Sequence, residues 1–559
     1  MDIALIIIGS ILIILLIRGV FLERKKRLSL YDALKNEFGT KREKKYKYGK
    51  NHLDGILKRY GKGELIDEIT WNDLDMETVF ERIDKCKSAV GEEYLYAMLH
   101  TEHPEDGGKK FDELVSRLQD DQKERTDILM SLSRLGYVKG LSPFDYLDYL
   151  TEKKSRFPIK HILTNLLYLP AIALIFFKPI WGGIALFLVV LLNIFLYFRY
   201  KKSLSGVMES IGFVIRLSRE GLKLIKGNSD YLKDERQKIT KVEKLLRSII
   251  GKGGYLAVSG SGGVSATGNP LEIFLTYFNM IFHIDLIQFD LLIGSLAGKK
   301  NVLEYLLLLF GRLDAAISVA DFRASLNGYY CKPRFSSFSG DKKDIGLTIE
   351  NGYHPLVEKF VSNSISAKRG VLLTGSNASG KSTFLRMVAV NAILAQSIYT
   401  VCAKLYVAPA YNIYSSIALK DNLLGKESYF IVEIKSVKRI LTADCEKYPV
   451  LCFIDEVLRG TNTVERISAS ETILKYFSQR PILCFAATHD SLLADILAES
   501  YDNYHFSESV ENTDVYFDYT LKKGKAVSRN AINLLKSYGY PEEITDEAEI
   551  MAHKLDSNT

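Results

Sequence analysis

The chain has 559 residues, of which 47% are hydrophobic and 25% are charged. This globular composition excludes a disordered chain, leaves apolar surface for a membrane and allows three or four domains. The net charge of +7 is too diluted over this length to indicate nucleic-acid binding by itself. The six cysteines include no C-x-x-C pair or metal-like cluster, so we predict reduced thiols in a cytosolic compartment and no zinc.

The chain opens with an apolar segment, residues 3–22, in which Arg18 is the only charged side chain. An arginine near the end of a membrane helix can extend to the headgroup region. A basic cluster follows at 24–27. We predict a transmembrane anchor with its basic flank over residues 1–27, and the positive-inside rule places residue 23 onward in the cytoplasm. A cleaved signal peptide is the alternative, but the segment lacks a basic start and an A-x-A-like cleavage site.

A second pair of apolar runs lies at 162–177 and 180–198, separated by Lys178 and Pro179. Each run is near the lower limit of the ~17–25 residues that span a bilayer. Basic side chains flank the pair on both sides, which predicts a transmembrane hairpin over 161–198. The alternative is a buried helical hairpin of a soluble core. The preceding region, 28–160, is predicted to be mostly helical because apolar residues recur at helical spacing.

Residues 199–345 are predicted to form a helical, lever-like region. Within it, 203–250 reads as a long amphipathic helical stretch with a basic face, which suits either a solvated helix face or contact with nucleic acid or anionic lipid. The glycine-rich segments 251–254 and 259–265 predict a flexible loop. The apolar stretch 273–296 carries ionisable side chains that would be costly in a bilayer, so we predict a soluble core helix there.

The most informative motif lies at 375–383, where the sequence fits G-x-x-x-x-G-K-[ST]. Apolar residues 370–374 predict a strand before it and residues 384–390 predict a helix after it, the context in which this loop wraps nucleotide phosphates. Lys381 is placed to reach the β- and γ-phosphates, and the Ser382 hydroxyl to face Mg²⁺. A chance match in a glycine-rich turn is the alternative. The predicted phosphate-binding residues are Gly375, Ser376, Asn377, Ala378, Ser379, Gly380, Lys381, Ser382 and Thr383.

Two further buried strands, 450–454 and 482–487, are predicted by continuous apolar runs. Asp455 and Glu456 follow the first at its carboxyl end, where open α/β sheets bind ligands. We predict that Asp455 holds Mg²⁺ and that Glu456 polarises the attacking water, although such a pair can also cap a helix. His489 follows the second strand and is a candidate γ-phosphate sensor, with a purely structural histidine as the alternative.

Residues 374–383, 454–463 and 487–489 together resemble the ATPase domain of the DNA mismatch-repair MutS family, a branch of the ATP-binding-cassette ATPases. The resemblance implies an α/β P-loop ATPase domain over 346–559 that binds ATP and Mg²⁺ and forms a homodimer. Residues 351–357 resemble the segment near the adenine, which places His354 there. Residues 421–433 resemble the signature loop, in which Ser428 reaches the γ-phosphate bound by the partner subunit.

The resemblance has departures. Residues 425–427 and 464–466 differ from the usual pattern, and no counterpart of the mismatch-reading module is visible before the core-like segment that begins at Trp71. The sequence therefore predicts a multi-pass cell-membrane ATPase with its ATPase domain in the cytoplasm, which acts on DNA without sequence or mismatch specificity. The alternative is a mechanochemical membrane ATPase that acts on a protein or lipid partner. Solute export is disfavoured because three spans offer little pathway.

Overall fold

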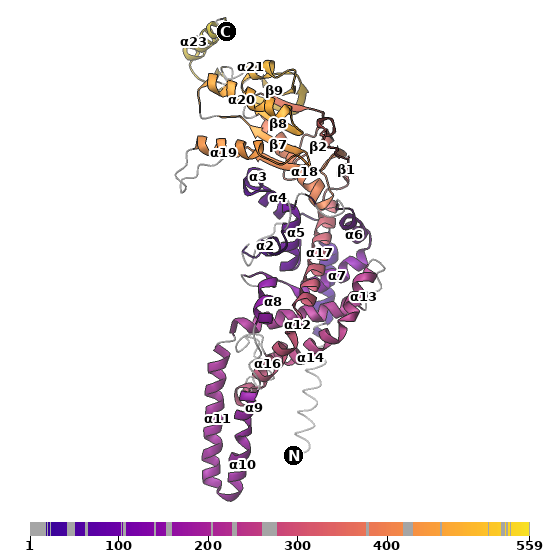
Figure 1. The fold of residues 1–559 in the computed structure, drawn as a ribbon, viewed down its shortest axis with the longest axis vertical. Helices are drawn as coiled ribbons and strands as arrows, with labels where there is room; N and C mark the ends of the chain where they lie inside the picture. The colour runs from indigo at the N-terminus through magenta and orange to yellow at the C-terminus, as the bar shows by residue number, and fades with distance from the viewer. Residues whose placement is uncertain are drawn as a thin grey trace. The chain divides into compact units, whose positions relative to one another are not determined.

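The computed structural model describes residues 18, 21–22, 24–41, 51–61, 65–101, 103, 108–138, 141–152, 159–202, 205–225, 232–259, 277–375, 379–417, 429–458, 461–511, 514–526, 532, 535–536 and 538–557. Contacts divide the chain into two compact units (Figure 1). Unit 1 lies within residues 1–60, 84–97 and 114–321, and unit 2 within residues 61–83, 98–113 and 322–559. Of the predicted anchor at 3–22, only Arg18, Phe21 and Leu22 are among the described residues.

The predicted, mostly helical character of the chain before the strands of unit 2 is confirmed for the described residues as far as Ser325. Helices that lie before residue 326 include α2 (Gly55–Tyr60), α3 (Glu68–Asp73), α4 (Met76–Ile83), α5 (Ala89–His100), α6 (Lys109–Asp120), α7 (Gln122–Leu135), α8 (Pro143–Glu152), α9 (Ile159–Leu166), α10 (Tyr168–Phe177), α11 (Pro179–Lys202), α12 (Ser205–Ile225), α13 (Lys233–Lys241), α14 (Glu243–Ser259), α16 (Ile284–Leu296) and α17 (Lys300–Ser325).

Helices α10 and α11 form a hairpin in unit 1 and lie side by side (Figure 1). Pro179 begins α11, a position where proline's fixed φ and missing N–H are tolerated. Two stretches, Ile159–Phe177 and Pro179–Lys201, are long and apolar enough to cross a membrane by length and composition. Most of their large apolar side chains are exposed in the described structure. This observation agrees with the predicted hairpin, and an assignment to a membrane remains a proposal.

The predicted loop at 251–254 is wrong, because these residues lie in α14. Gly253 faces α12 closely: a Cβ on it would lie 2.5 Å from Cδ1 of Ile215. The glycine therefore serves close helix packing rather than a turn. The predicted basic stretch 203–250 is helical where the structure describes it, and it is divided among α12, α13 and α14. In the predicted stretch 273–296, helix α16 packs its buried apolar face as expected of a core helix.

The described residues of unit 2 form two sheets with ten strands in all. The larger has six strands in the order β10-β9-β4-β8-β7-β6, all parallel except β10, which is antiparallel to β9. The smaller has the order β1-β5-β2-β3. The ten strands are β1 (Arg334–Phe335), β2 (Leu347–Gly352), β3 (Asn363–Ala367), β4 (Gly370–Thr374), β5 (Leu405–Ala408), β6 (Asn412–Ser416), β7 (Val450–Asp455), β8 (Ile482–Thr488), β9 (Tyr501–Glu511) and β10 (Asp514–Lys523).

The larger sheet is parallel at its centre because helices connect its strands and cover it. The unit 2 helices after residue 326 include α18 (Lys381–Ile398), α19 (Tyr429–Leu441), α20 (Thr463–Ser478), α21 (Ser491–Ile496) and α23 (Glu542–Ser557). Strands β4, β7 and β8 are buried along almost their whole length, which explains their continuous apolar sequences. The three predicted strands and the helix after residue 383 are thus confirmed.

Candidate functional site

The site lies at the carboxyl edge of the central strands of unit 2. Thr374, the last residue of β4, pairs directly with Thr488 of β8, and Asp455 of β7 pairs with Ala487 of β8. This register brings three predicted elements to one edge of the sheet. They are the loop after β4, the acidic pair at the end of β7 and the residue that follows β8.

The loop after β4 depends on glycine at two positions. Gly375 has φ +136° and Gly380 has φ +105°, values that side chains rarely tolerate. The surroundings are also close, because a Cβ on Gly375 would lie 3.1 Å from the Phe506 carbonyl oxygen and one on Gly380 would lie 3.1 Å from the Tyr519 ring. Residues 376–378 of the predicted loop lie outside the described residues.

Lys381 begins α18 and is almost fully buried, with 1% of its surface exposed. Its Nζ donates a hydrogen bond to the carbonyl oxygen of Gly375 at 2.5 Å. The ammonium group is therefore held inside the curve of the loop. This is where the helix N-terminus and the loop amides also concentrate positive potential.

Ser382 and Asp455 meet directly in the structure. The Ser382 hydroxyl donates to Oδ2 of Asp455 at 2.5 Å, although the two residues lie 73 positions apart in sequence. Each was predicted independently to face Mg²⁺, and the fold brings their oxygen atoms together. Hydroxyl and carboxylate oxygens form the kind of donor set that Mg²⁺ prefers.

Glu456 and His489 also form a pair. Nε2 of His489 lies 2.8 Å from Oε1 of Glu456, and both side chains are partly exposed. Glu456 adopts φ +59°, which is uncommon for a residue with a side chain, and its amide donates to the Ala487 carbonyl at 2.9 Å. Backbone in this region is energetically costly and tends to be kept where it aims a functional side chain.

An ion pair beside these residues was missed from the sequence. Arg466 of α20 donates from Nε to Oδ2 of Asp490 at 3.1 Å and from Nη2 to Oδ1 at 3.0 Å. Hydrogen bonding to Asp490 is the main reason that the pKa of Arg466 is raised, and the charge of Glu456 adds to it. A cavity of about 180 Å³ is lined by both partners together with Glu456 and His489. The only sequence signal was the departure from the family pattern at residues 464–466.

His354 lies at a second cavity, of about 380 Å³, whose lining also includes Gly380, Thr383 and Tyr519. Burial lowers the pKa of His354 to about 4, so the ring is neutral near pH 7. Its Nδ1 accepts a hydrogen bond from the Leu356 amide at 3.3 Å, while its Nε2 is buried without a hydrogen-bond partner. A buried polar atom of this kind indicates an absent hydrogen-bonding partner.

Ser428 and most of the predicted signature loop, 421–433, lie outside the described residues. Strand β6 leads towards this segment, and its end is fixed by α3. The buried carboxylate of Asp73 accepts hydrogen bonds from Ser415 Oγ at 2.9 Å and from the Ile417 amide at 2.8 Å. On the other side of the segment, Arg439 of α19 pairs with Asp67. These long-range anchors were not visible in the sequence.

Comparison with known proteins agrees with this architecture. A family model described as MutS domain V matches residues 371–556. A DNA mismatch repair protein MutS from Pseudothermotoga lettingae is 31% identical over 282 residues, which cover 48% of this chain and 33% of that protein. A protein of the same description from Natronomonas pharaonis is 30% identical over 257 residues, 44% of this chain and 29% of that protein.

A DNA mismatch repair protein MutS 2 from Halobacterium salinarum is 29% identical over 277 residues, which cover 47% of this chain and 31% of that protein. The chain spans about a third of the length of these relatives. The matched region contains the loop after β4, the acidic pair after β7 and the residue after β8. Residues 371–556 of the chain therefore belong to the MutS domain V family.

Proposed function

We propose that the chain is a Mg²⁺-dependent ATPase whose active site lies at the carboxyl edge of β4, β7 and β8. One observation carries this proposal. Lys381, the Ser382–Asp455 pair and the Glu456–His489 pair come from separate segments and converge at this edge. Together they supply a cation for phosphate, oxygen donors for a metal ion and a base for water, which are the functions that phosphate-anhydride hydrolysis needs.

The described residues fit ATP and Mg²⁺. A side chain at Gly375 or Gly380 would fill the loop, as the close approaches to Phe506 and Tyr519 show. The buried, unpartnered Nε2 of His354 borders a cavity that continues to Gly380 and is large enough for a base and sugar. The Ser382 and Asp455 oxygens would hold Mg²⁺, which neutralises phosphate charge when bound.

The protein's own groups then have separate tasks. Lys381 would bind the β- and γ-phosphates. Its hydrogen bond to the Gly375 carbonyl oxygen holds the ammonium group at the loop where these phosphates would lie. Glu456 would accept the proton of the attacking water, and His489 would hold the Glu456 carboxylate in position and face the γ-phosphate. Loop residues 375–383 would cradle the phosphates with their backbone amides.

We further propose a homodimer in which Ser428 of each chain completes the ATP site of its partner. This assignment rests on the family's signature loop. The chain is held to α3 on both sides of the signature loop: Asp73 binds Ile417 before it, and Asp67 binds Arg439 after it. Movements of α3 would therefore reach the contact between Ser428 and the partner's ATP.

The proposed location is the cell membrane, with the ATPase domain in the cytoplasm. The exposed apolar side chains of α10 and α11 support a membrane hairpin. The stretches Ile159–Phe177, which contains α9 and α10, and Pro179–Lys201 are long and apolar enough to cross a bilayer. By the positive-inside rule, the regions beside the basic flanks at 24–27 and 199–202 would lie on the cytoplasmic side. Labelling of a Lys178→Cys variant from outside intact cells tests this topology, and labelling only after permeabilisation contradicts it.

We propose that ATP hydrolysis drives an action on DNA, since the curated relatives are described as DNA mismatch repair proteins. Exposed cations on α12, α13 and α14 offer phosphate contacts, which carry no base information. These cations include Arg219, Lys238, Lys241, Lys244 and Arg247. A membrane ATPase that acts on a protein or lipid partner is the second candidate, supported by the hairpin.

The deciding experiment measures ATP hydrolysis and duplex binding by the full-length chain in detergent, with and without Mg²⁺. We expect Mg²⁺-dependent hydrolysis and DNA binding that weakens steeply with salt. We also expect a preference for a G·T mismatch below about tenfold, or about 1.4 kcal/mol. Hydrolysis without any salt-sensitive DNA binding would favour the second candidate.

A further inference from the structure

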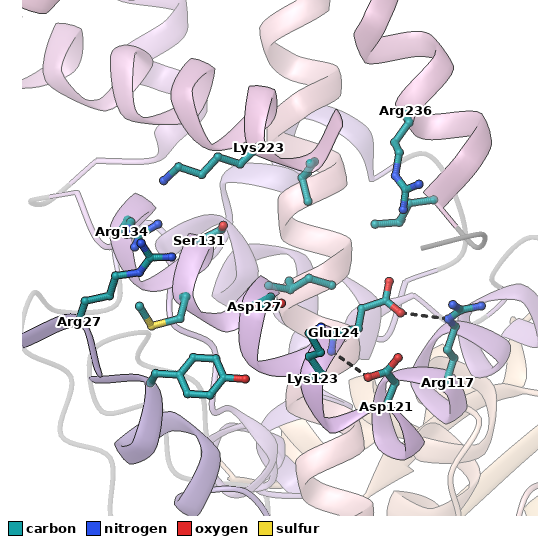
Figure 2. Close-up of a pocket in the computed structure, with 15 residues that line it drawn as sticks. Arg27, Arg117, Asp121, Lys123, Glu124, Asp127, Ser131, Arg134, Lys223 and Arg236 are labelled. Atoms are coloured by element: carbon teal, nitrogen blue, oxygen red, sulfur yellow. Dashed lines mark hydrogen bonds and ion pairs between the residues drawn. The ribbon is translucent and has the colours of Figure 1, made fainter. Parts of the chain in front are cut away.

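A cavity of about 530 Å³ lies within unit 1, away from every residue assigned to ATP above. It is bordered by α7, α12, α13 and the helical residues 24–36 (Figure 2). Six of its lining side chains are cationic and three are carboxylates, Asp121, Glu124 and Asp127, which leaves a formal excess of three positive charges (six minus three). The six cations are Arg27, Arg117, Lys123, Arg134, Lys223 and Arg236.

Two of the three carboxylates have local tasks. Asp121 caps α7, where its side chain accepts a hydrogen bond from the Glu124 amide at 2.8 Å. Glu124 pairs with Arg117 at 3.2 Å. Among the described residues, Arg27, Lys123 and Arg236 have no ion-pair partner. Glu220, which lies outside the lining, pairs with Lys223 at 2.6 Å and with Arg134 at 3.8 Å. The positive charge of the cavity is therefore only partly neutralised.

Arg236 is the most informative of these side chains. Its Nε and Nη2 atoms are buried and have no hydrogen-bond partner. Removing a guanidinium from water without a counter-ion is unfavourable, and such groups in proteins are normally paired. Figure 2 shows Arg236 extending from α13 on the same side of the cavity as Arg117, while Arg27 and Arg134 gather on the opposite side.

The remaining lining is apolar. Ile128, Leu224 and Leu232 are buried hydrophobic residues that border the same space. A cavity of this volume with an apolar wall and a few directed polar groups is typical of small-molecule sites. The cavity thus combines an anion-binding part with a part that suits a carbon skeleton.

We propose that this cavity binds a phosphate monoester attached to an apolar group, with Arg236 as its main anion contact. Phosphate oxygens match the planar fork of a guanidinium in two parallel hydrogen bonds. A dianionic phosphate also matches the excess positive charge. The ligand is either a soluble phosphorylated compound or the headgroup of a membrane lipid. A lipid headgroup could reach the cavity because Arg27 lies close in sequence to the predicted membrane anchor at 3–22.

The test uses full-length protein in detergent that carries Lys381→Ala, so that the proposed ATP site does not contribute. Calorimetry with phenyl phosphate should show saturable binding of one molecule per chain, stronger than binding of inorganic phosphate. Arg236→Gln should weaken this binding by at least about tenfold, the effect of losing one charge-assisted contact. The matched control Arg480→Gln, an exposed arginine beyond the end of α20 and outside the cavity lining, should leave it unchanged.

Vesicles of phosphatidylcholine with and without phosphatidic acid distinguish the two sources. Binding of phenyl phosphate in solution assigns a soluble ligand, and Arg236-dependent binding to phosphatidic acid vesicles alone assigns a lipid headgroup. Without ligand, Arg236→Gln should unfold at the same or a higher temperature, because it removes two buried nitrogen atoms that have no hydrogen-bond partner. If that variant does not fold, Lys123→Gln at the exposed side of the cavity replaces it. The absence of saturable binding to either probe, or equal binding by the cavity variants, overturns the proposal.

Discussion

Nε2 of His489 lies 2.8 Å from Oε1 of Glu456, so the residues that follow β8 and β7 form one unit at the edge of the sheet. We expect that His489 orients the Glu456 carboxylate. His489→Ala should then keep ATP binding and lower the hydrolysis rate by about tenfold or more. This loss is smaller than the roughly 10²–10⁴-fold that general acid–base catalysis contributes as a whole, because Glu456 itself remains. His489→Gln retains a hydrogen-bond donor and should lose less. Steady-state hydrolysis measures both, and an unchanged rate for His489→Ala would exclude the orienting role.

Lys381 is expected to be essential for binding rather than for the chemical step alone. Its removal leaves the phosphates without their buried cation. Lys381→Ala should therefore weaken ATP binding by at least a hundredfold, or about 2.8 kcal/mol. Equilibrium binding of a fluorescent ATP analogue measures this change. Lys368→Ala, an exposed lysine just before β4, is the matched control and should bind as the wild type does.

The Arg466–Asp490 pair is expected to control the rate. Asp490 directly follows His489, and two hydrogen bonds hold it to Arg466. Arg466→Ala should leave the ATP dissociation constant nearly unchanged and lower the turnover number by about tenfold, since it removes a positioning contact. The double exchange Arg466→Asp with Asp490→Arg should recover part of the rate. Arg480→Ala, an exposed arginine beyond the end of α20, serves as control, and a loss of ATP affinity in Arg466→Ala would refute the positioning role.

The sequence was sufficient to predict the strands and glycines around the proposed ATP site because their signals are local. Continuous apolar runs identified β4, β7 and β8, and the glycines at 375 and 380 occupy conformations that need them. The same local reasoning failed at Gly253. There, the absence of a side chain permits contact with Ile215, which is distant in sequence.

Pairs between distant segments account for most of what the sequence did not reveal. Asp73 and Ser415 are separated by 342 positions, and no local pattern links them. Arg466 and Asp490 meet only because α20 begins close to the place where β8 ends. The Ser382–Asp455 contact was easier to anticipate, because both residues belong to motifs whose shared ligand had already been inferred.

A buried carboxyl group in unit 1 gives a pH prediction. Burial raises the pKa of Glu93 to about 9, although Ser142 Oγ donates to its Oε2 at 3.0 Å. Because the folded pKa is above the ordinary value of 4.5, the folded state retains a proton that the unfolded state loses. The stability contribution is therefore fully present below about pH 4.5 and declines as pH rises towards 9, by at most about 1.4 kcal/mol per pH unit.

The amide of Glu93→Gln does not titrate, so this variant should lack the part of the pH dependence of stability that Glu93 causes. Its unfolding temperature relative to the wild type should rise between pH 5 and pH 8. Thermal unfolding at a series of pH values measures the difference. Glu113→Gln, on an exposed position of α6, should track the wild type throughout. A constant difference between Glu93→Gln and the wild type would mean that Glu93 is already ionised in the folded protein.

The central claim is that Glu456 activates water at an ATP site formed by the carboxyl edge of β4, β7 and β8. The most direct measurement compares ATP binding and single-turnover hydrolysis by the wild type and Glu456→Gln, both as full-length protein with Mg²⁺. The account predicts equal binding and a hydrolysis rate about a hundredfold or more lower in the variant, since an amide cannot accept the proton. Hydrolysis by Glu456→Gln at the wild-type rate would contradict it.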